Sequence, residues 1–404
     1  MQARARPLAL LSSLGASVLL SVLSGACSSA SGPAALRTDC ASVELLVAAS
    51  DYQSSVVCGA PGCELSAGTT GVDLGADPQL SFSNGRAFFI ARTQDLVFEL
   101  DPTCATPIAK ASVHDLGPRN PQTGTITSAN PHDAAVAPDG SVFLPLYNVG
   151  RIAILRDGKL DGPGIDLSSY DADGNPQAES IRIVDVNGSA KAFVTLERLD
   201  DTGSGTAYMQ AKQPSLMLRI DVATRTVEAA IELAGRNPFN VMAEHDGVLY
   251  LAEPRNFDAA DEDLAGIERF DTKTSTSSIL VTERALGASV SEVAVTDGCG
   301  VAIVAGPAHD VNPTSVVTFD PTSGAVVQGI ESPLLATAGY DLQGLAWRGD
   351  TLYVGDRRAA SGGYPIHVFE RTPGTCSLHD TGRTLLLPSP AVALRPTPLS
   401  GNQR

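Results

Sequence analysis

Basic residues, aromatic residues and helical patterning are all scarce in this chain of 404 residues. Lysine and arginine number 28 against 45 acidic residues, a formal net charge of −17. This balance excludes a general binder of nucleic-acid backbones, because such proteins need a basic surface. Aromatic residues make up 5 % and tryptophan occurs once, at Trp347, which argues against folds that use one tryptophan per repeat. No long amphipathic helical pattern follows residue 26, so we expect an all-β protein.

Common catalytic and metal-binding motifs are also missing. The chain has no Cys-x-x-Cys pair, so a zinc ribbon or a thioredoxin-like site is not supported. It also has no Gly-x-Ser-x-Gly elbow, phosphate-binding glycine loop or zinc-protease motif. We therefore assign no catalytic residue from the sequence.

The N-terminus has the pattern of an export signal. Arg4 and Arg6 precede an apolar run over 7–23 that is short for a membrane span, and small residues then lead to Cys27. This segment resembles a bacterial lipoprotein processing site, which implies that Cys27 is lipidated and that the protein is a lipid-anchored envelope component. Ordinary cleavage after Ala26 is the alternative, because Ser24 occupies the position where leucine is usual. We expect a signal peptide over 1–26 and a flexible tether over 27–39.

Short β-rich segments recur about every 50 residues. Their centres are residues 46, 89, 144, 194, 250, 303 and 353. Most follow an Asn-Gly or Asp-Gly dipeptide, as at 84–85 and 246–247, which supplies the positive φ angles of a tight hairpin. One further strand upstream and two downstream give four strands per unit. Four-stranded units repeated radially form a β-propeller, and seven segments predict seven blades.

The two ends of the chain are predicted to share one blade. The N-terminal unit has a second, a third and a fourth strand but no first strand, whereas residues 390–395 resemble an isolated first strand. Pairing these segments closes the ring and removes its open edge. We therefore expect a seven-bladed propeller of antiparallel strands over 40–398, followed by a tail over 399–404.

Three segments, at 130–140, 220–238 and 317–327, resemble the YVTN-type repeat of bacterial surface propellers. Propellers of that type are mostly binding or scaffold modules, so the resemblance implies such a role, although a fold alone does not fix a function. The sequence marks of WD repeats and of quinone-cofactor propellers are absent.

Cysteine spacing in an exported chain suggests disulfides. If Cys27 is lipidated, an even number of six cysteines remains. The first expected pair flanks a short turn, the second joins turns of neighbouring units, and the third is left by elimination. These pairs are Cys58–Cys63, Cys299–Cys376 and Cys40–Cys104.

Nearly all long loops are predicted on one face of the ring, which we call the top face. If the first strand of each blade runs from top to bottom, the insertions over 114–129, 166–178, 199–214, 255–265, 306–314 and 356–365 all fall on top. Loops on a rigid scaffold commonly carry function. We therefore expect a monomer that binds an unidentified envelope protein, a peptide or a glycan through this acidic face.

One top-face segment has oxygen ligands at spacings that a calcium loop uses. Asp171, Asp173, Asn175 and Glu179 supply the carboxylates and amide that calcium prefers. The segment is not an EF-hand, because Pro176 stands at the glycine position. The alternative is a turn with solvated carboxylates. Calcium is the one cofactor that the sequence suggests.

The entries of the first strands give a second candidate site. Polar side chains that fall near one position there are Asp133, Asn240, Glu292 and Gln343, with Glu179 close by and His132 adjacent. First strands line the channel of a propeller, so we expect these residues at its top mouth. Lactonases of the gluconolactonase type hold a metal in such a ring, which makes a metal-dependent hydrolase the alternative function, although the flanking motifs of that family are absent. The other interpretation is that these side chains only cap backbone amides of loops.

Overall fold

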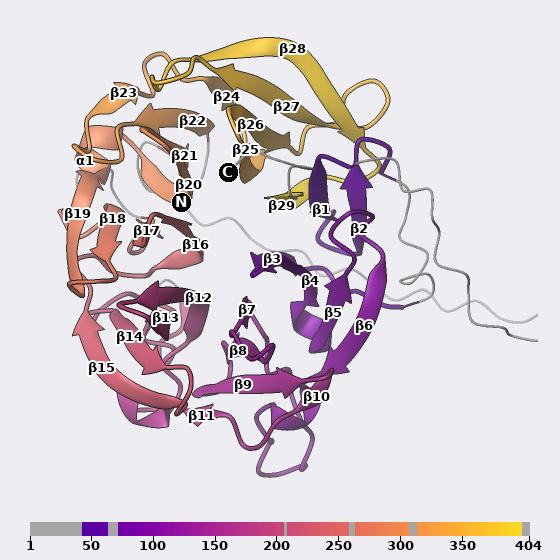
Figure 1. Ribbon diagram of the computed structural model, residues 1–404, viewed down its shortest axis with the longest axis vertical. Coiled ribbons are helices and arrows are strands. Elements are labelled where there is room, and N and C mark those ends of the chain that lie inside the picture. Colours follow the sequence, from indigo (N-terminus) through magenta and orange to yellow (C-terminus); the bar gives the residue numbers. More distant parts are fainter. Residues whose placement is uncertain (1–42, 64–71, 206–207, 258–262, 307–312, 398–404) are drawn as a thin grey trace, which may run out of the picture. The chain divides into compact units, whose positions relative to one another are not determined.

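Seven antiparallel sheets are arranged in a ring in the computed structural model (Figure 1). The structure describes residues 43–63, 72–205, 208–257, 263–306 and 313–397. The chain divides into two units, Met1–Asp39 and Cys40–Arg404, and every described residue belongs to the second. The predicted all-β, seven-bladed propeller is confirmed.

The blades are named here in chain order, with their strands given from the centre outward. Blade 1 contains β3 (Pro78–Ser83), β4 (Arg86–Ala91), β5 (Leu96–Leu100) and β6 (Pro107–Ser112), and blade 2 contains β7 (Ala135–Val136), β8 (Val142–Leu146), β9 (Arg151–Arg156), β10 (Lys159–Leu160) and β11 (Ile165–Asp166). Blade 3 contains β12 (Ala178–Val186), β13 (Ser189–Leu196), β14 (Leu216–Asp221) and β15 (Thr226–Glu232), and blade 4 contains β16 (Phe239–His245), β17 (Val248–Glu253), β18 (Gly266–Asp271) and β19 (Thr276–Thr282). Blade 5 contains β20 (Ser289–Thr296), β21 (Cys299–Ala305), β22 (Thr314–Phe319), β23 (Val326–Gln328) and β24 (Leu335–Thr337), and blade 6 contains β25 (Leu342–Arg348), β26 (Thr351–Asp356), β27 (Tyr364–Arg371) and β28 (Leu378–Leu387).

Strands from both ends of the chain form the closing blade. The last strand, β29 (Ala391–Pro396), pairs antiparallel with β1 (Leu45–Ser50), which also pairs with β2 (Ser55–Ala60). This blade has three strands within the described residues, and its predicted two-ended construction is confirmed. Beyond β29, the Thr397 hydroxyl donates to the carbonyl of Val43 at 2.7 Å.

The innermost strands complete the ring. Each contacts the innermost strand of the next blade, in the order β29, β3, β7, β12, β16, β20, β25 and back to β29. Seven clusters of buried apolar side chains lie in the described residues, one at each interface between neighbouring blades. Blade-to-blade packing of apolar side chains is therefore the main source of stability.

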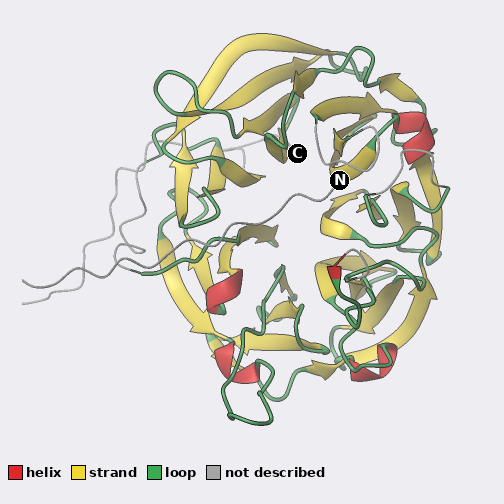
Figure 2. Cartoon of the chain, turned by 180° about the vertical axis from the view of Figure 1, so that it is seen from behind, coloured by secondary structure: helices red, strands yellow, loops and turns green. Residues whose placement is uncertain are grey.

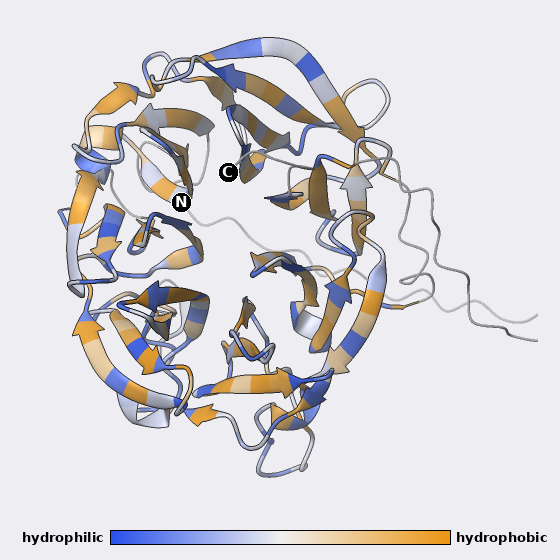
Figure 3. Ribbon diagram, viewed as in Figure 1, coloured by the Kyte–Doolittle hydropathy of each residue, from blue (hydrophilic) through white to orange (hydrophobic). Residues whose placement is uncertain are grey.

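Burial patterns explain why the strands have different sequences. The second strand β21 is buried at every position because neighbouring blades cover both of its faces, and its sequence is a continuous small and apolar run. The outer strand β15 alternates between exposed and half-buried positions, as expected for a strand with one solvated face. Figure 3 shows this contrast, with long hydrophilic stretches on the outer strand β28.

Tight hairpins join the first and second strands at the bottom face. Asn84 and Gly85 have φ angles of 48° and 74°, and Asp246 and Gly247 have 51° and 75°. Two successive positive φ angles are typical of a type I′ turn, which favours Asn, Asp and Gly. The predicted turn dipeptides at these positions therefore have the expected geometry.

In the part of the chain that the structure describes, helices are confined to short turns between strands (Figure 2). The described helices are η2 (Arg92–Gln94), η3 (His114–Leu116), η4 (Ser168–Tyr170) and α1 (Glu283–Leu286). None of the helices among the described residues is long and apolar enough to span a membrane.

Two of the predicted disulfides are present. Cys58 and Cys63 are joined across 5.1 Å between Cα atoms, and Cys299 and Cys376 across 4.7 Å. Cys104 is also disulfide-bonded, while its predicted partner lies outside the described residues, as does Cys27. The predicted partner of Cys104 is Cys40.

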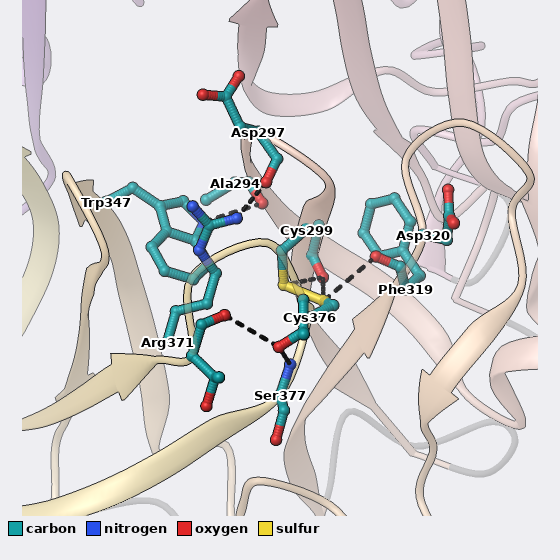
Figure 4. Close-up of a disulfide and its surroundings, with 12 residues drawn as sticks. Ala294, Asp297, Cys299, Phe319, Asp320, Trp347, Arg371, Cys376 and Ser377 are labelled. Atoms are coloured by element: carbon teal, nitrogen blue, oxygen red, sulfur yellow. Dashed lines mark hydrogen bonds between the residues drawn. A yellow bond between two sulfur atoms is a disulfide. The ribbon is translucent and has the colours of Figure 1, made fainter.

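The Cys299–Cys376 disulfide links blade 5 to blade 6 at the bottom face (Figure 4). Close to it, Trp347 of blade 6 donates from its indole nitrogen to the carbonyl of Ala294 in blade 5 at 3.4 Å. Arg371 donates to the carboxylate of Asp350 at 2.9 Å and also to a backbone carbonyl of blade 5. This interface therefore combines a covalent link with hydrogen bonds between blades.

Candidate functional site

A cavity of about 460 Å³ opens at the top mouth of the channel. All seven blades contribute to its wall, through residues that include Tyr52, Asp77, Gln79, Arg92, His132, Tyr147, Glu179, Glu197, Asn237, Phe239, Asn240, Arg255, Phe257, Ser291, Glu292, Tyr340, Gln343 and Val392. Its volume lies in the range of sites that hold small molecules or single side chains of a partner.

The second strands place a polar residue at this mouth. The residue three positions after the centre of the recurring segment is Arg92, Tyr147, Glu197, Glu253 or Asp356 in five of the seven blades. Three of these five, Arg92, Tyr147 and Glu197, line the cavity. These three residues are functional candidates that were not predicted from the sequence. The predicted site residues came from the entries of the first strands, whereas these three follow the apolar segments of the second strands.

Two residue pairs join blade 2 to blade 3 in the cavity wall. The Nδ1 of His132 contacts the carboxylate of Glu179, and the Tyr147 hydroxyl donates to the Oε2 of Glu197 at 2.5 Å. The His132 and Tyr147 rings stack, with centroids 4.2 Å apart and planes 12° apart. Both acids come from blade 3 and both rings from blade 2, so the contact between these blades fixes the arrangement.

Burial changes the proton affinities of this group. Burial, followed by the negative charge of Glu179, raises the pKa of Glu197 well above its usual range. Burial and the charge of Glu197 likewise raise the pKa of Tyr147 well above its usual range. Burial lowers the pKa of His132, although the nearby Glu179 opposes that effect. The wall therefore holds a neutral imidazole close to Glu197, whose ionisation is opposed by burial and by the charge of Glu179.

Glu253 adds a further buried acid next to this group. Glu253 is 0 % exposed, and neither of its carboxylate oxygens has a hydrogen-bond partner among the residues that the structure describes. Burial, followed by the charges of Glu268 and Glu197, raises its pKa well above the usual range. An unpaired buried carboxyl costs free energy, so this position points to a function rather than to packing.

Positive charge in the wall is limited. Arg92 donates to Asp77, at 3.0 Å from its Nε, and its Nη1 lies 3.4 Å from the Nδ1 of His132. Arg255 is the other guanidinium among the lining residues. Against these two cations stand the carboxylates of Asp77, Glu179, Glu197 and Glu292.

A hydrogen bond across the channel marks the floor of the cavity. Gln79 of blade 1 donates to the Oδ1 of Asn240 of blade 4 at 3.2 Å. Asn240 and Glu292 also line a second cavity of about 210 Å³, which is bordered by Arg182 and Arg395. The two cavities therefore meet at Asn240 and Glu292.

Five of the six residues predicted at the mouth line the upper cavity, but each has partners in the fold. Besides His132, Glu179 and Asn240, these are Glu292 and Gln343. Glu292 accepts from the backbone amides of Gly344 and Leu345, both at 2.9 Å. Gln343 accepts from the Tyr52 hydroxyl at 3.0 Å and from Arg357 at 3.1 Å.

Asp133, the sixth residue of that set, is not among the residues that line the cavity. Its two oxygens accept five hydrogen bonds, from Ser81, Ala134, Ser180, Ile181 and Arg182. Burial opposes its ionisation, but the Arg182 guanidinium and these donors lower its pKa. Asp133, at the entry of blade 2, thus links this blade to blade 1 and to blade 3.

The side chains proposed as calcium ligands each contact a different partner in the fold. Glu179 faces His132, and Asp171 accepts from Gln213 at 2.7 Å. Asp173 accepts from the backbone amide of Asn175 at 2.8 Å, and the Oδ1 of Asn175 is buried without a partner. Within the described ranges, the one group of His, Cys, Asp and Glu with ligand atoms all within 4.8 Å lies elsewhere, in bottom-face turns, at His245, Asp246 and Asp297.

Comparison with solved structures shows similarity in fold. The chain is similar to a putative 6-phosphogluconolactonase from Bacteroides uniformis ATCC 8492, with 12 % identity and a TM-score of 0.51 over 88 % of this chain and 99 % of that one. Citrobacter koseri AztD gives 11 % identity and a TM-score of 0.48 over 90 % and 100 %. BamB from Moraxella catarrhalis gives 14 % and 0.41 over 87 % and 88 %.

Searches for a family gave no match. No family model and no curated protein matches the sequence. At the identities found among solved structures, the likeness concerns the fold alone. The comparisons therefore identify a β-propeller of the kind found in bacterial proteins and assign the chain to no family.

Proposed function

We propose that this protein is an exported, lipid-anchored propeller of the YVTN type that binds a partner of the cell envelope through its top cavity. The observation that carries the proposal is the cavity itself, to which all seven blades contribute lining residues. A ring closed by the pairing of its two ends holds these residues in place before a partner arrives, which reduces the entropy lost on binding.

The N-terminal segment and the disulfides support the export part of this proposal. Arg4, Arg6 and the apolar run before Cys27 have the pattern of a lipoprotein signal. Structural disulfides such as Cys58–Cys63 and Cys299–Cys376 persist in oxidising compartments outside the cytosol.

A metal-dependent hydrolase is the second candidate. Glu179, Glu197, Glu292 and Asn240 line one cavity, and one protein of similar fold is titled a putative 6-phosphogluconolactonase. However, the carboxylates are directed to partners within the fold, namely His132, the Tyr147 hydroxyl and two backbone amides. This arrangement supports a binding cavity better than a set of convergent metal ligands.

Capture from the native envelope tests the proposal. The full chain would be compared with a Glu197→Gln/Tyr52→Ala variant, which alters the cavity, and with Asp246→Asn, which alters an exposed bottom-face turn. We expect the cavity variant to lose a partner that the wild type and Asp246→Asn retain. Equal capture by all three proteins would refute binding through the cavity, and stoichiometric metal together with metal-dependent lactone hydrolysis would favour the second candidate.

A further inference from the structure

The chemistry of the cavity wall specifies the ligand more closely than its shape does. Four carboxyl groups and two guanidiniums are among the lining residues, so acidic groups outnumber basic groups by two in the wall. The fully buried Glu253 adds another acidic group, close enough to Glu197 to raise its own pKa. A desolvated surface with this imbalance favours a positively charged ligand.

Two lining residues present hydrogen-bond acceptors without donors. The Nδ1 of His132 is directed to the carboxylate of Glu179, so Nδ1 carries the proton of the neutral ring and Nε2 is an acceptor. This Nε2 is buried, in a residue that is 6 % exposed, and has no partner within the described ranges. Asn237, 7 % exposed, donates through its amide nitrogen to the carbonyl of Arg255 at 2.6 Å, while its Oδ1 is buried and has no partner among the described residues either. Buried polar atoms are normally hydrogen-bonded, so both acceptors favour a ligand that donates hydrogen bonds.

Aromatic residues are concentrated around the same space. They make up only 5 % of the chain, yet five of the 24 lining residues are aromatic. These are Tyr52, Tyr147, Phe239, Phe257 and Tyr340. Aromatic faces attract cations, and Tyr52 already shows this with Arg357, whose guanidinium carbon lies 4.2 Å from the ring centroid.

We propose that the top cavity binds a cationic nitrogen group, an alkylammonium or a guanidinium, carried by its ligand. The positive charge of the ligand favours the ionised form of Glu197, which compensates that charge together with Glu179. The aromatic rings surround the carbon stem, and the N–H groups donate to the unpaired acceptors of the wall. This inference rests on the proposed function, because it names the chemical class recognised by the same cavity. The group comes either from a lysine or arginine side chain of a partner protein or from a free amine.

Titration of the purified full chain with small probes tests the inference. The probes are Nα-acetyl-lysinamide, its neutral analogue Nα-acetyl-norleucinamide, cadaverine, N-acetylglucosamine and calcium chloride. Calorimetry and saturation-transfer NMR measure the binding of each probe. We expect the lysine derivative to bind at least about tenfold more tightly than the norleucine derivative, a difference of about 1.4 kcal/mol. Binding of the lysine derivative alone identifies a side chain as the source, whereas equal binding of cadaverine identifies a free amine.

Two variants and a control locate the binding group. Glu197→Gln removes the ionisable carboxyl group but keeps an oxygen that accepts from Tyr147, so we expect a loss of about tenfold in affinity with little change in the melting temperature. Tyr147→Phe serves as a second variant if the first is unstable, and Glu232→Gln, an exposed acid on β15 of the same blade, is the matched control. Equal affinity for the lysine and norleucine derivatives, or unchanged binding in both cavity variants, would overturn the inference.

Other outcomes separate this inference from the proposed function. Binding of N-acetylglucosamine or calcium without binding of the lysine derivative overturns the cationic ligand but leaves the cavity as a binding site. If the cavity variant Glu197→Gln/Tyr52→Ala captures the same envelope partners as the wild type, the proposed function is overturned instead.

Discussion

The hydroxyl of Tyr147 in blade 2 donates to the carboxylate of Glu197 in blade 3, at 2.5 Å and inside the top cavity. The two residues are 50 positions apart and occupy equivalent places at the ends of their second strands. One structural position of the repeat therefore supplies a hydrogen-bond donor in one blade and an acceptor in the next. This reuse of a single position turns a repeated scaffold into an asymmetric site.

Glu253 should make the protein less stable as the pH rises. Its pKa is raised in the folded state, so above the ordinary glutamate range the unfolded chain loses a proton that the folded chain retains. The free energy of unfolding then falls with increasing pH until the raised pKa is passed. Glu253→Gln should reduce the stability difference between pH 5 and pH 8 by at least about 1.4 kcal/mol, the equivalent of one pKa unit. Urea unfolding at both pH values measures it, with Glu232→Gln as control; identical pH profiles for wild type and Glu253→Gln would refute the assignment.

Deleting residues 390–404 should open the ring. This truncation removes β29 and exposes the edge of β1, with which it pairs. We expect aggregation or a lower melting temperature by size-exclusion chromatography and thermal melts. Deletion of 398–404 alone leaves the paired strand intact and should behave as the wild type. A monomeric 390–404 truncation that melts normally would contradict closure by the two ends.

Cys27→Ser should release the protein from membranes and abolish its labelling with a fatty acid, because the thiol is the proposed lipid attachment point. Ser24→Leu restores the residue that is usual at such a processing site and should keep the label. Membrane fractionation of the three proteins makes the comparison. Unchanged fractionation of Cys27→Ser would argue for ordinary cleavage after Ala26.

Calcium binding by the segment 171–179 stays a prediction, and the structure defines a sharper test of it. Burial and the neighbouring Asp173 raise the pKa of Asp201, so these two carboxylates repel each other in the folded state. Calcium at millimolar concentration should raise the melting temperature by binding the folded state. Asp173→Asn with Asp201→Asn should remove that increase, and Asp246→Asn should keep it. An absent calcium effect would leave the segment as a solvated acidic surface.

The fold was predictable from local signals. Apolar second strands recur about every 50 residues, most of them after a turn dipeptide such as Asn84-Gly85, so seven blades follow from counting. Closure was predictable too, because 390–395 has the pattern of a first strand without a blade of its own. These features depend on a few neighbouring residues at a time.

The site depended on contacts that local patterns do not contain. The pairing of first and second strands is irregular near the top of blades 3, 4, 5 and 6, so an alignment of strand entries does not preserve side-chain direction. The carboxylate of Asp133 accepts hydrogen bonds from blades 1 and 3, and the sequence does not show that these donors lie beside it. Glu197 and Glu253 directly follow or end apolar strands, and only the packing of neighbouring blades shows that they are buried acids.

Hydrogen–deuterium exchange of the full chain, with and without the partner captured from the native envelope, tests the central claim most directly. The cavity account predicts slower exchange in the segments that border the cavity, 197–205, 237–240 and 255–257, on partner binding. The bottom-face turns at 84–85, 187–188 and 246–247 should exchange at unchanged rates. Protection confined to those bottom-face turns, with no change in the segments that border the cavity, would contradict recognition through the top cavity.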